Sequence, residues 1–333
     1  MFRKNIRILG TGSFLSSNRV NNNDLEKSLG LAHGWIDKHC GVSTRYHIKD
    51  EEASEMGKEA ALIAIKRAGI DLKDIDLVIG TSGTMQQAIP SMAALIHNKL
   101  GLVKTPTFDV NSTCLSFLSG LSIAAELIES KNYKNVLLVS ADISSPGLNP
   151  KDPKTATLLG DGAAAVVVGP SKNSNSHIKG VAFETWSEAQ NACVFEACGT
   201  KFLSKKPPKK EAHRQYFQMN GPRLFKVTLP YALKMMETLL TKANTTIKDM
   251  DVIIPHQASP STLNIFQKKL QRKYGDLPGH FINIVKSFGN MIAVSIPHAL
   301  DYAIQNSLLK RGDQCLMLGT SAGISLGGVL LEY

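Results

Sequence analysis

Apolar and polar residues alternate along the chain in blocks that predict short buried strands next to amphipathic helices. Residues 72–79, Leu-Lys-Asp-Ile-Asp-Leu-Val-Ile, recur as Ile-Lys-Asp-Met-Asp-Val-Ile-Ile at 247–254, an offset of 175 residues. Each copy follows a segment whose apolar residues have helical spacing, 54–69 before the first and 229–243 before the second. This repeat predicts that one helix-and-strand unit occurs twice.

A second pair of apolar strands, 135–141 and 314–320, shows the same duplication at an offset of 179 residues. Helical patterns precede both strands, at 115–131 and at 292–309. Short apolar strands that alternate with helices of this length are typical of α/β proteins with mostly parallel sheets. We therefore expect a duplicated α/β fold.

The repeat divides the 333 residues into two expected halves, 1–171 and 172–333. A hydrophobic content of 43% and a charged content of 20% are ordinary for globular proteins and exclude disordered and fibrous classes. The longest stretch of apolar residues and glycine, 162–169, is far shorter than the roughly 20 residues that span a bilayer. No signal-peptide pattern opens the chain, so we expect a cytoplasmic protein without a membrane segment.

The formal net charge of +10 favours acidic partners, such as nucleic acids, anionic surfaces, nucleotides or an acidic carrier protein. The basic run 205–210, within the lysine-rich segment 201–214, is expected to be a solvated loop, with a docking patch as the alternative. Because aromatic and basic residues do not alternate there, nucleic-acid binding is not expected.

Five cysteines occur, and none belongs to a Cys-x-x-Cys pair. This spacing excludes a disulfide scaffold and a zinc knuckle, so no metal site is expected. Cys193 and Cys198 are expected to be structural residues.

Gly10 and Gly12 follow the apolar segment 6–9 like the start of a dinucleotide-binding loop. The third glycine of that motif is missing. We therefore expect a turn after a strand at this place.

Cys114 is the first candidate catalytic residue, because it separates the strand-to-turn segment 108–113 from the apolar helical segment 115–128. A thiol at a helix N-terminus is close to the positive end of the helix dipole, which lowers its pKa and favours the thiolate. This position predicts a nucleophile. The alternative is a buried cysteine that acts as a small apolar side chain.

His256 and Asn290 are the next candidates, because each occupies the end of a predicted strand or a strand-to-helix junction. Asn290 lies 176 residues after Cys114, so the duplication predicts that the two residues occupy equivalent junctions. Open parallel sheets bind their ligands at such strand ends. A lone His or Asn there is usually structural, but three polar groups at matched positions predict a site.

Short motifs follow one another along almost the whole chain. In chain order they are Gly34-Trp-Ile36, Gly41-Val-Ser-Thr-Arg45, Ile89-Pro-Ser91, Asp109-Val-Asn-Ser-Thr-Cys114, Leu159-Gly-Asp-Gly-Ala163, Met219-Asn-Gly221 with Phe225-Lys226, Pro255-His-Gln-Ala258, Phe288-Gly-Asn290 with Ser295-Ile-Pro297, and the glycine-rich stretch 319–333. In this order they resemble the β-ketoacyl-acyl-carrier-protein synthase III family, condensing enzymes of the thiolase superfamily.

The resemblance implies a five-layered αβαβα thiolase fold with two mostly parallel mixed sheets, and a homodimer. It implies that Cys114 takes an acyl group from a thioester, while His256 and Asn290 bind the carbonyl of a second thioester. The backbone N–H groups of Cys114 and Ala322 would form the oxyanion hole. No cofactor is implied: acyl-CoA or an acyl group on acyl carrier protein is the substrate, and the carrier protein is the partner.

Five residues are implied to bind the substrate. Trp35 would stack on a nucleotide base, whereas His39 and Lys154 stand where the family usually has arginines for coenzyme A. That difference favours delivery of the acyl group on a carrier protein. Ile89 replaces an aromatic residue that reaches across the dimer to the acyl pocket, which suggests a primer longer than acetyl, and Leu115 could offset this by filling space.

Lys226, Lys268 and Lys269 match basic positions at which the family docks its acidic carrier, while Ser261 replaces an arginine. The alternative for each lysine is an ordinary solvated helix residue.

Decarboxylative Claisen condensation of an acyl primer with malonyl-acyl carrier protein is the function that this resemblance implies. Loss of CO₂ generates an enolate, and two aligned donors stabilise its oxygen. Two alternatives remain: acyl transfer to a non-malonyl acceptor on the same fold, and a non-catalytic carrier-binding subunit. A papain-like hydrolase also uses Cys, His and Asn, but the duplicated α/β pattern and the missing Cys-Gly-x-Cys-Trp motif argue against it.

Overall fold

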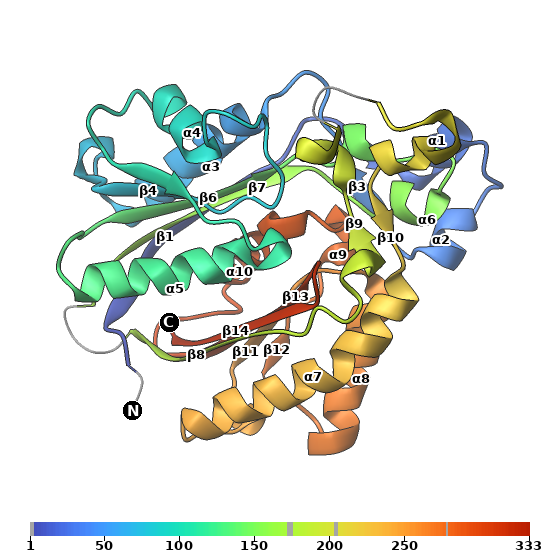
Figure 1. Cartoon of the computed structure of the whole chain (residues 1–333). Coiled ribbons are helices and arrows are strands. Elements are labelled where there is room, and N and C mark those ends of the chain that lie inside the picture. Colours follow the sequence, from blue (N-terminus) through green and yellow to red (C-terminus); the bar gives the residue numbers. More distant parts are fainter. Residues whose placement is uncertain (1–2, 172–175, 203–205, 278) are drawn as a thin grey trace.

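Two five-stranded sheets form the centre of the molecule (Figure 1). The computed structural model describes residues 3–171, 176–202, 206–277 and 279–333. The predicted boundary between residues 171 and 172 therefore adjoins a segment outside the described residues.

The two sheets have the same topology. The first has the order β1-β7-β6-β4-β5 and the second the order β8-β14-β13-β11-β12. In each, the last three strands run parallel, and the other two pairings are antiparallel. The first sheet comprises β1 (Ile6–Phe14), β4 (Leu77–Gly80), β5 (Thr107–Asp109), β6 (Val136–Asp142) and β7 (Gly162–Pro170); the second comprises β8 (His177–Thr185), β11 (Val252–Pro255), β12 (His280–Phe281), β13 (Gln314–Ser321) and β14 (Ser325–Glu332). The predicted duplication of an α/β unit with mixed sheets is confirmed.

Helices cover both outer faces and fill the space between the sheets, which gives five layers (Figure 1). The helices α5 (Ser116–Glu129) and α10 (Ser295–Gln305) pack between the sheets in the largest apolar core. The outer face of the first sheet packs on α3 (Ala53–Ala68) and α4 (Met92–Leu100), and that of the second on α7 (Gly221–Lys242) and α8 (Pro260–Tyr274).

Smaller elements connect these layers. They are α1 (Asn22–Leu29), α2 (Trp35–His39), α6 (Pro153–Ala156) and α9 (Val285–Phe288), the strand pair β2 (Arg19–Asn21) and β3 (Thr44–Tyr46), and the pair β9 (Cys193–Val194) and β10 (Gln218–Met219). None of the helices that the described residues form is both long and apolar enough to cross a membrane.

Two predicted helix starts differ from the structure. The helix expected from residue 229 begins at Gly221, because Asn220 caps it by accepting a hydrogen bond from Arg223 N at 3.1 Å. The helix expected from residue 115 begins at Ser116, after a single 3-10 turn, η2 (Thr113–Leu115). The equivalent turn before α10 is η9 (Ile292–Val294).

Gly10 and Gly12 lie inside β1, so the predicted turn is wrong. Strand β1 passes so close to α3 that a Cβ atom on Gly12 would lie 2.4 Å from the carbonyl oxygen of Ala60. On Gly10 it would lie 2.3 Å from the carbonyl oxygen of Ala64. These glycines therefore allow close packing of a strand on a helix rather than a change of chain direction.

Gly12→Ala should lower the free energy of unfolding by about 1–3 kcal/mol, the usual cost of forcing extra atoms into a packed interior. Urea unfolding followed by circular dichroism measures the loss. Ser13→Ala is the matched control, because its buried hydroxyl has no hydrogen-bond partner among the described residues. An equal effect of both substitutions would contradict the packing argument.

Candidate active site

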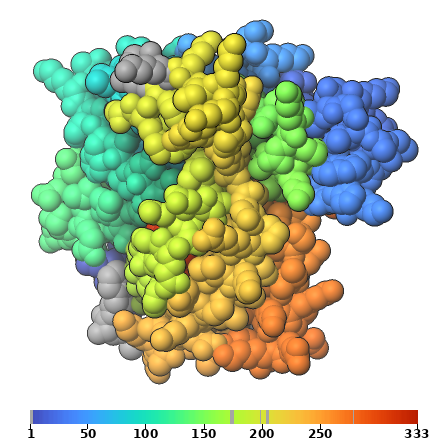
Figure 2. Space-filling view, turned by 45° about the vertical axis from the view of Figure 1, so that its right-hand side comes forward, coloured from blue at the N-terminus to red at the C-terminus, as the bar shows by residue number. Residues whose placement is uncertain are grey.

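The three candidate catalytic side chains line one cavity between the halves. The cavity contains about 1360 Å³ of space that no protein atom fills, including space open to solvent, and Cys114, His256 and Asn290 all contribute to its wall. Figure 2 shows the segment from β9 to the start of α7, in yellow-green and yellow, across the face between the two halves. The structure thus brings together residues that lie far apart in the sequence.

Cys114 lies in the 3-10 turn between β5 and α5. Thr113 has a φ of 50°, a left-handed value that is rare for a β-branched residue. Two hydroxyls hold the turn: Ser116 Oγ donates to Thr113 O at 2.7 Å, and Ser321 Oγ donates to Ser112 O at 2.9 Å. The turn is therefore fixed by residues of both halves.

Burial raises the pKa of the Cys114 thiol to about 12, and nearby Cys193 and Asp142 act in the same direction. The backbone N–H groups of Ala322 and of Cys114 itself bond to the sulfur and lower this pKa, but the burial effect is larger. The expectation of an available thiolate at the helix N-terminus is wrong for this structure. Cys114 is a neutral thiol at neutral pH.

His256 directly follows β11 and is buried. Its backbone N–H donates to Leu318 O at 2.7 Å, which holds it to the neighbouring strand β13. Burial lowers the pKa of the imidazole to about 4, so the ring is neutral at pH 7. A neutral imidazole both donates and accepts a hydrogen bond.

Gln257 fixes the loop that follows His256. Its side-chain nitrogen donates to Pro255 O at 2.7 Å and Ile282 O at 3.0 Å. Its side-chain oxygen accepts from the backbone N–H groups of Ile284 at 2.8 Å and Val285 at 3.1 Å. One buried amide therefore joins the end of β11 to the segment that follows β12. Gln257 lies within the sequence motif 255–258, but its role follows only from the fold.

Asn290 is oriented by contacts with both halves. Its Oδ1 accepts from Ile292 N at 2.9 Å, so Nδ2 is the donor end, and Nδ2 donates to Ala258 O at 3.1 Å. The backbone of Asn290 pairs with Leu158 O and Gly160 N of the first half, each at 3.0 Å. An amide nitrogen carries two hydrogens, and the described residues accept one, so the second is available to a substrate oxygen.

Asp142, at the end of β6, joins the two halves beside the cavity. The carboxylate accepts hydrogen bonds from Gly83 N at 2.8 Å, Thr84 N at 2.6 Å, Thr84 Oγ1 at 2.8 Å and Ala293 N at 2.9 Å. Burial raises its pKa to about 6 although these bonds favour the charged form. The Asp142 carboxylate thus connects Gly83 and Thr84, which line the cavity, to the 3-10 turn η9 after Asn290.

The prediction that Asn290 and Cys114 occupy equivalent positions is wrong by three residues. In the structure Asn290 matches Asn111, because each side-chain oxygen accepts from the backbone N–H two residues later, Thr113 and Ile292, at 2.9 Å in both cases. Cys114 matches Ala293. The two candidate residues still line one cavity because the junctions themselves face each other.

Cys193 also lines the cavity, which the sequence analysis did not predict. It lies in β9, which pairs with Met219 of β10, and it is close enough to Cys114 to influence its pKa. Burial raises the pKa of Cys193 to about 11. The cysteine spacing carries no signal for this proximity, because it arises from the tertiary fold.

Leu115 does not line the cavity, which corrects its predicted role in the acyl pocket. Its side chain is buried against the backbone of β13 and β14, where Cβ atoms on Gly319 and Gly327 would lie 2.6 and 3.2 Å from it. The 3-10 turn directs Cys114 to the cavity and Leu115 to the packed strands β13 and β14. Leu115 therefore belongs to the central core.

The other four predicted substrate-binding residues are outside the cavity wall of this chain. Trp35 and His39 place their rings 4.6 Å apart on α2, and His39 is exposed. Lys154 is exposed on α6, and Ile89 is 85% exposed. Their roles stay predictions.

Lys226 on α7 and Lys268 and Lys269 on α8 are exposed. Both helices also line the cavity, through Phe225 and Thr262 among others. The lysines therefore lie on elements that lead to the candidate site, and their docking role stays a prediction. In the predicted basic loop, residues 203–205 lie outside the described residues.

Three family models match the chain. That of 3-oxoacyl-[acyl-carrier-protein (ACP)] synthase III matches residues 108–187, and that of its C-terminal part matches 240–333. The thiolase N-terminal domain matches 40–144.

Relatives match over almost their full length. A β-ketoacyl-[acyl-carrier-protein] synthase III from Clostridioides difficile (strain 630) is 33% identical, with 98% of each chain covered. Another, from Neisseria gonorrhoeae (strain NCCP11945), is 34% identical, with 98% of this chain and 99% of the relative covered. The crystal structure of 3-oxoacyl-[acyl-carrier-protein] synthase III from Aquifex aeolicus VF5 is 31% identical, with a TM-score of 0.87 over 98% of this chain and all of its own.

Cys114 should react slowly with iodoacetamide at pH 7, and its rate should rise about tenfold per pH unit up to pH 9, because the thiolate is the reactive form and the pKa is about 12. Peptide mass spectrometry over a time course measures the rate at this cysteine. Cys114→Ser identifies labelling at other sites. A plateau below pH 8 would show a preformed thiolate and contradict the effect of burial.

Proposed function

This chain belongs to the 3-oxoacyl-[acyl-carrier-protein] synthase III family of fatty-acid condensing enzymes, and we propose that it joins an acyl thioester primer to malonyl-acyl carrier protein. The observation that carries the proposal is the meeting of one thiol and two neutral donors in one cavity, at Cys114, His256 and Asn290. The reaction is a decarboxylative Claisen condensation through an acyl-cysteine.

In the first half-reaction the Cys114 sulfur attacks the thioester carbonyl of the primer. Because the thiol is neutral, its proton must leave as the C–S bond forms, and the neutral imidazole of His256 supplies an acceptor. The backbone N–H groups of Cys114 and Ala322 lie at the sulfur, where they donate to the developing oxyanion. The tetrahedral intermediate then expels the carrier thiolate, which takes up a proton.

In the second half-reaction His256 and the free N–H of Asn290 donate to the thioester oxygen of the malonyl group. The bond to the carboxylate breaks, CO₂ leaves, and its electron pair forms an enolate. The enolate carbon attacks the acyl-cysteine, and the Cys114 sulfur leaves and is protonated. Neither donor has to remove a carbon-bound proton, because decarboxylation supplies the carbanion.

The two alternatives have less support. Acyl transfer to a non-malonyl acceptor needs no enolate donor, yet the side chain of Asn290 is held by hydrogen bonds with its nitrogen as the donor end. A non-catalytic carrier-binding subunit needs no thiol in the cavity.

The proposal includes an acyl carrier protein as partner and the cytoplasm as location. The exposed Lys226, Lys268 and Lys269 would meet the acidic carrier. The acyl primer arrives on coenzyme A or on a carrier protein, and no cofactor takes part. A catalytic thiol functions in a reducing compartment, which fits the cytoplasm.

The proposal also includes a homodimer. Four large apolar side chains on the segment 85–108 are exposed: Met85, Ile89, Val103 and Phe108. Phe108 belongs to β5, which ends the first sheet in this chain. An exposed apolar group beside an open sheet edge supports pairing with a second copy.

Intact-mass spectrometry after incubation with acyl-CoAs and acyl carrier proteins tests the first half-reaction. The native chain should gain the mass of one acyl group, and Cys114→Ala should gain none. Acylation of Cys114→Ala at another cysteine would refute the assignment. The mass gained also identifies the primer.

His256→Ala and Asn290→Ala should each lower the rate of condensation about 10²–10³-fold, the usual loss for one oxyanion donor. Acyl transfer to Cys114 should be nearly unchanged in Asn290→Ala. In His256→Ala it should fall, because the imidazole accepts the thiol proton, but by less than condensation falls. Both variants should therefore accumulate acyl-enzyme in the presence of malonyl thioester. Quenched-flow mass spectrometry measures both steps. If both variants fail to load the primer but still decarboxylate malonyl thioester, the assigned roles are wrong.

A further inference from the structure

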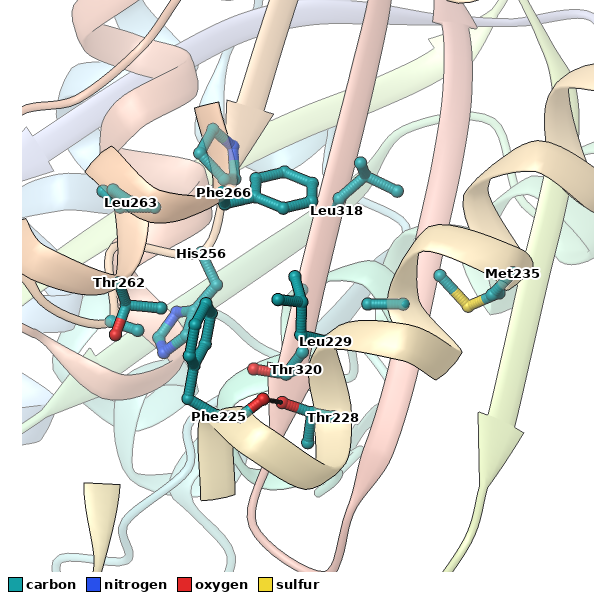
Figure 3. A pocket seen from close by; sticks show the side chains of 14 residues that line it. Phe225, Thr228, Leu229, Met235, His256, Thr262, Leu263, Phe266, Leu318 and Thr320 are labelled. Carbon is teal, nitrogen blue, oxygen red and sulfur yellow. Dashed lines mark hydrogen bonds between the residues drawn. The ribbon is translucent and has the colours of Figure 1, made fainter. Parts of the chain in front are cut away.

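A second pocket adjoins the catalytic cavity on the His256 side. It lies between α7, α8 and the ends of β11 and β13 (Figure 3). Its lining includes Phe225, Thr228, Leu229, Ala232, His256 and Thr320. Cys114 and Asn290 are not part of its lining. The pocket is therefore next to the group assigned to the second thioester, not to the acylated thiol.

The lining excludes a charged ligand. No carboxylate, ammonium or guanidinium group belongs to it, and His256 is neutral because burial lowers its pKa. The hydroxyl of Thr228 donates to Leu224 O at 2.9 Å, within its own helix. An apolar group is therefore the ligand that this pocket can bind without leaving a charge unpaired.

The pocket is narrow. It contains about 540 Å³ of space that no protein atom fills, including space open to solvent, but the centre of a water molecule can reach only about 60 Å³. A space of this size has room for a short alkyl group.

The two spaces share a wall. Phe225, Thr228, His256, Ala258, Thr262 and Thr320 line both of them. In Figure 3 the ring of Phe225 lies beside the imidazole of His256, with Leu229 and Thr320 on the pocket side. A thioester held by His256 therefore lies next to this pocket, whereas a primer on Cys114 lies in the larger cavity.

We propose that this pocket is an alkyl subsite for the second substrate, which takes a short alkyl group on the α-carbon of a 2-alkylmalonyl thioester. The inference rests on the proposed function and defines its substrate class. The acyl group of Cys114 and the 2-alkylmalonyl thioester give a 2-alkyl-3-oxoacyl thioester, CO₂ and the free thiol, with one proton taken up. The bond to CO₂ breaks, and its electron pair forms the new carbon–carbon bond as the acyl–sulfur bond breaks.

Competition between malonyl- and 2-ethylmalonyl-acyl carrier protein tests the proposal. The native enzyme should form both products, measured by mass spectrometry. Ala232→Leu fills the pocket and should lower the relative kcat/KM for 2-ethylmalonyl at least tenfold, as expected for displaced methylene groups. Thr241→Leu, at an exposed position on the same helix, should leave the ratio unchanged.

Leu229→Ala enlarges the pocket and should shift the preference toward 2-butylmalonyl.

A binding measurement keeps the test independent of condensation. Calorimetry with the Cys114→Ala enzyme should show tighter binding of 2-ethylmalonyl- than of malonyl-acyl carrier protein, and Ala232→Leu in that background should remove the difference. Equal binding of the two thioesters, or a product ratio that Ala232→Leu does not change, would show a mere packing gap and overturn the inference. Absence of any condensation with malonyl, despite the expected binding difference, would refute the proposed function instead.

Discussion

The structure depends on the contact between two equivalent junctions, each formed by a strand end, a 3-10 turn and a buried helix. One contains Thr113 and the other Ile292, and both of these β-branched residues have a φ of 50°. Such a conformation costs about 1–3 kcal/mol and persists only where the surroundings determine it. Here Ser321 bonds across to the first junction, and Asp142 bonds across to the second.

This contact explains why the candidate catalytic groups are neutral. The junctions meet deep between the sheets, so burial keeps Cys114 a thiol and His256 a neutral imidazole. In a low-dielectric cavity a charged pair would need strong compensation, whereas fixed N–H donors need no rearrangement when negative charge develops. Burial disfavours ionisation of the thiol, and in the proposed reaction it also strengthens the hydrogen bonds from the N–H donors to the oxyanions.

The sequence predicted the fold where the signal is local and repeated. Apolar runs such as 135–141 and 314–320 are buried on both faces, and such runs are readily recognised as central strands. The errors have tertiary causes. Gly12 is expected in a turn because the sequence does not show that α3 packs against this strand. Leu115 is expected in the acyl pocket because the sequence does not show the 3-10 turn that places it in the core. Cys193 reaches the cavity through β9, a two-residue strand without periodicity.

The two junctions also differ in a way that leaves the duplicated fold with one candidate nucleophile. Cys114 matches Ala293, and the last residue of β6, Asp142, matches the last residue of β13, Ser321. The carboxylate of Asp142 accepts a hydrogen bond from the backbone N–H of Ala293, so this amide is not available to a ligand. In the other junction the shorter Ser321 donates to Ser112 O instead, so the N–H of Cys114 stays directed at its own sulfur. Because one copy uses this amide to hold the halves together, the other copy is the one that keeps an amide donor for the proposed chemistry.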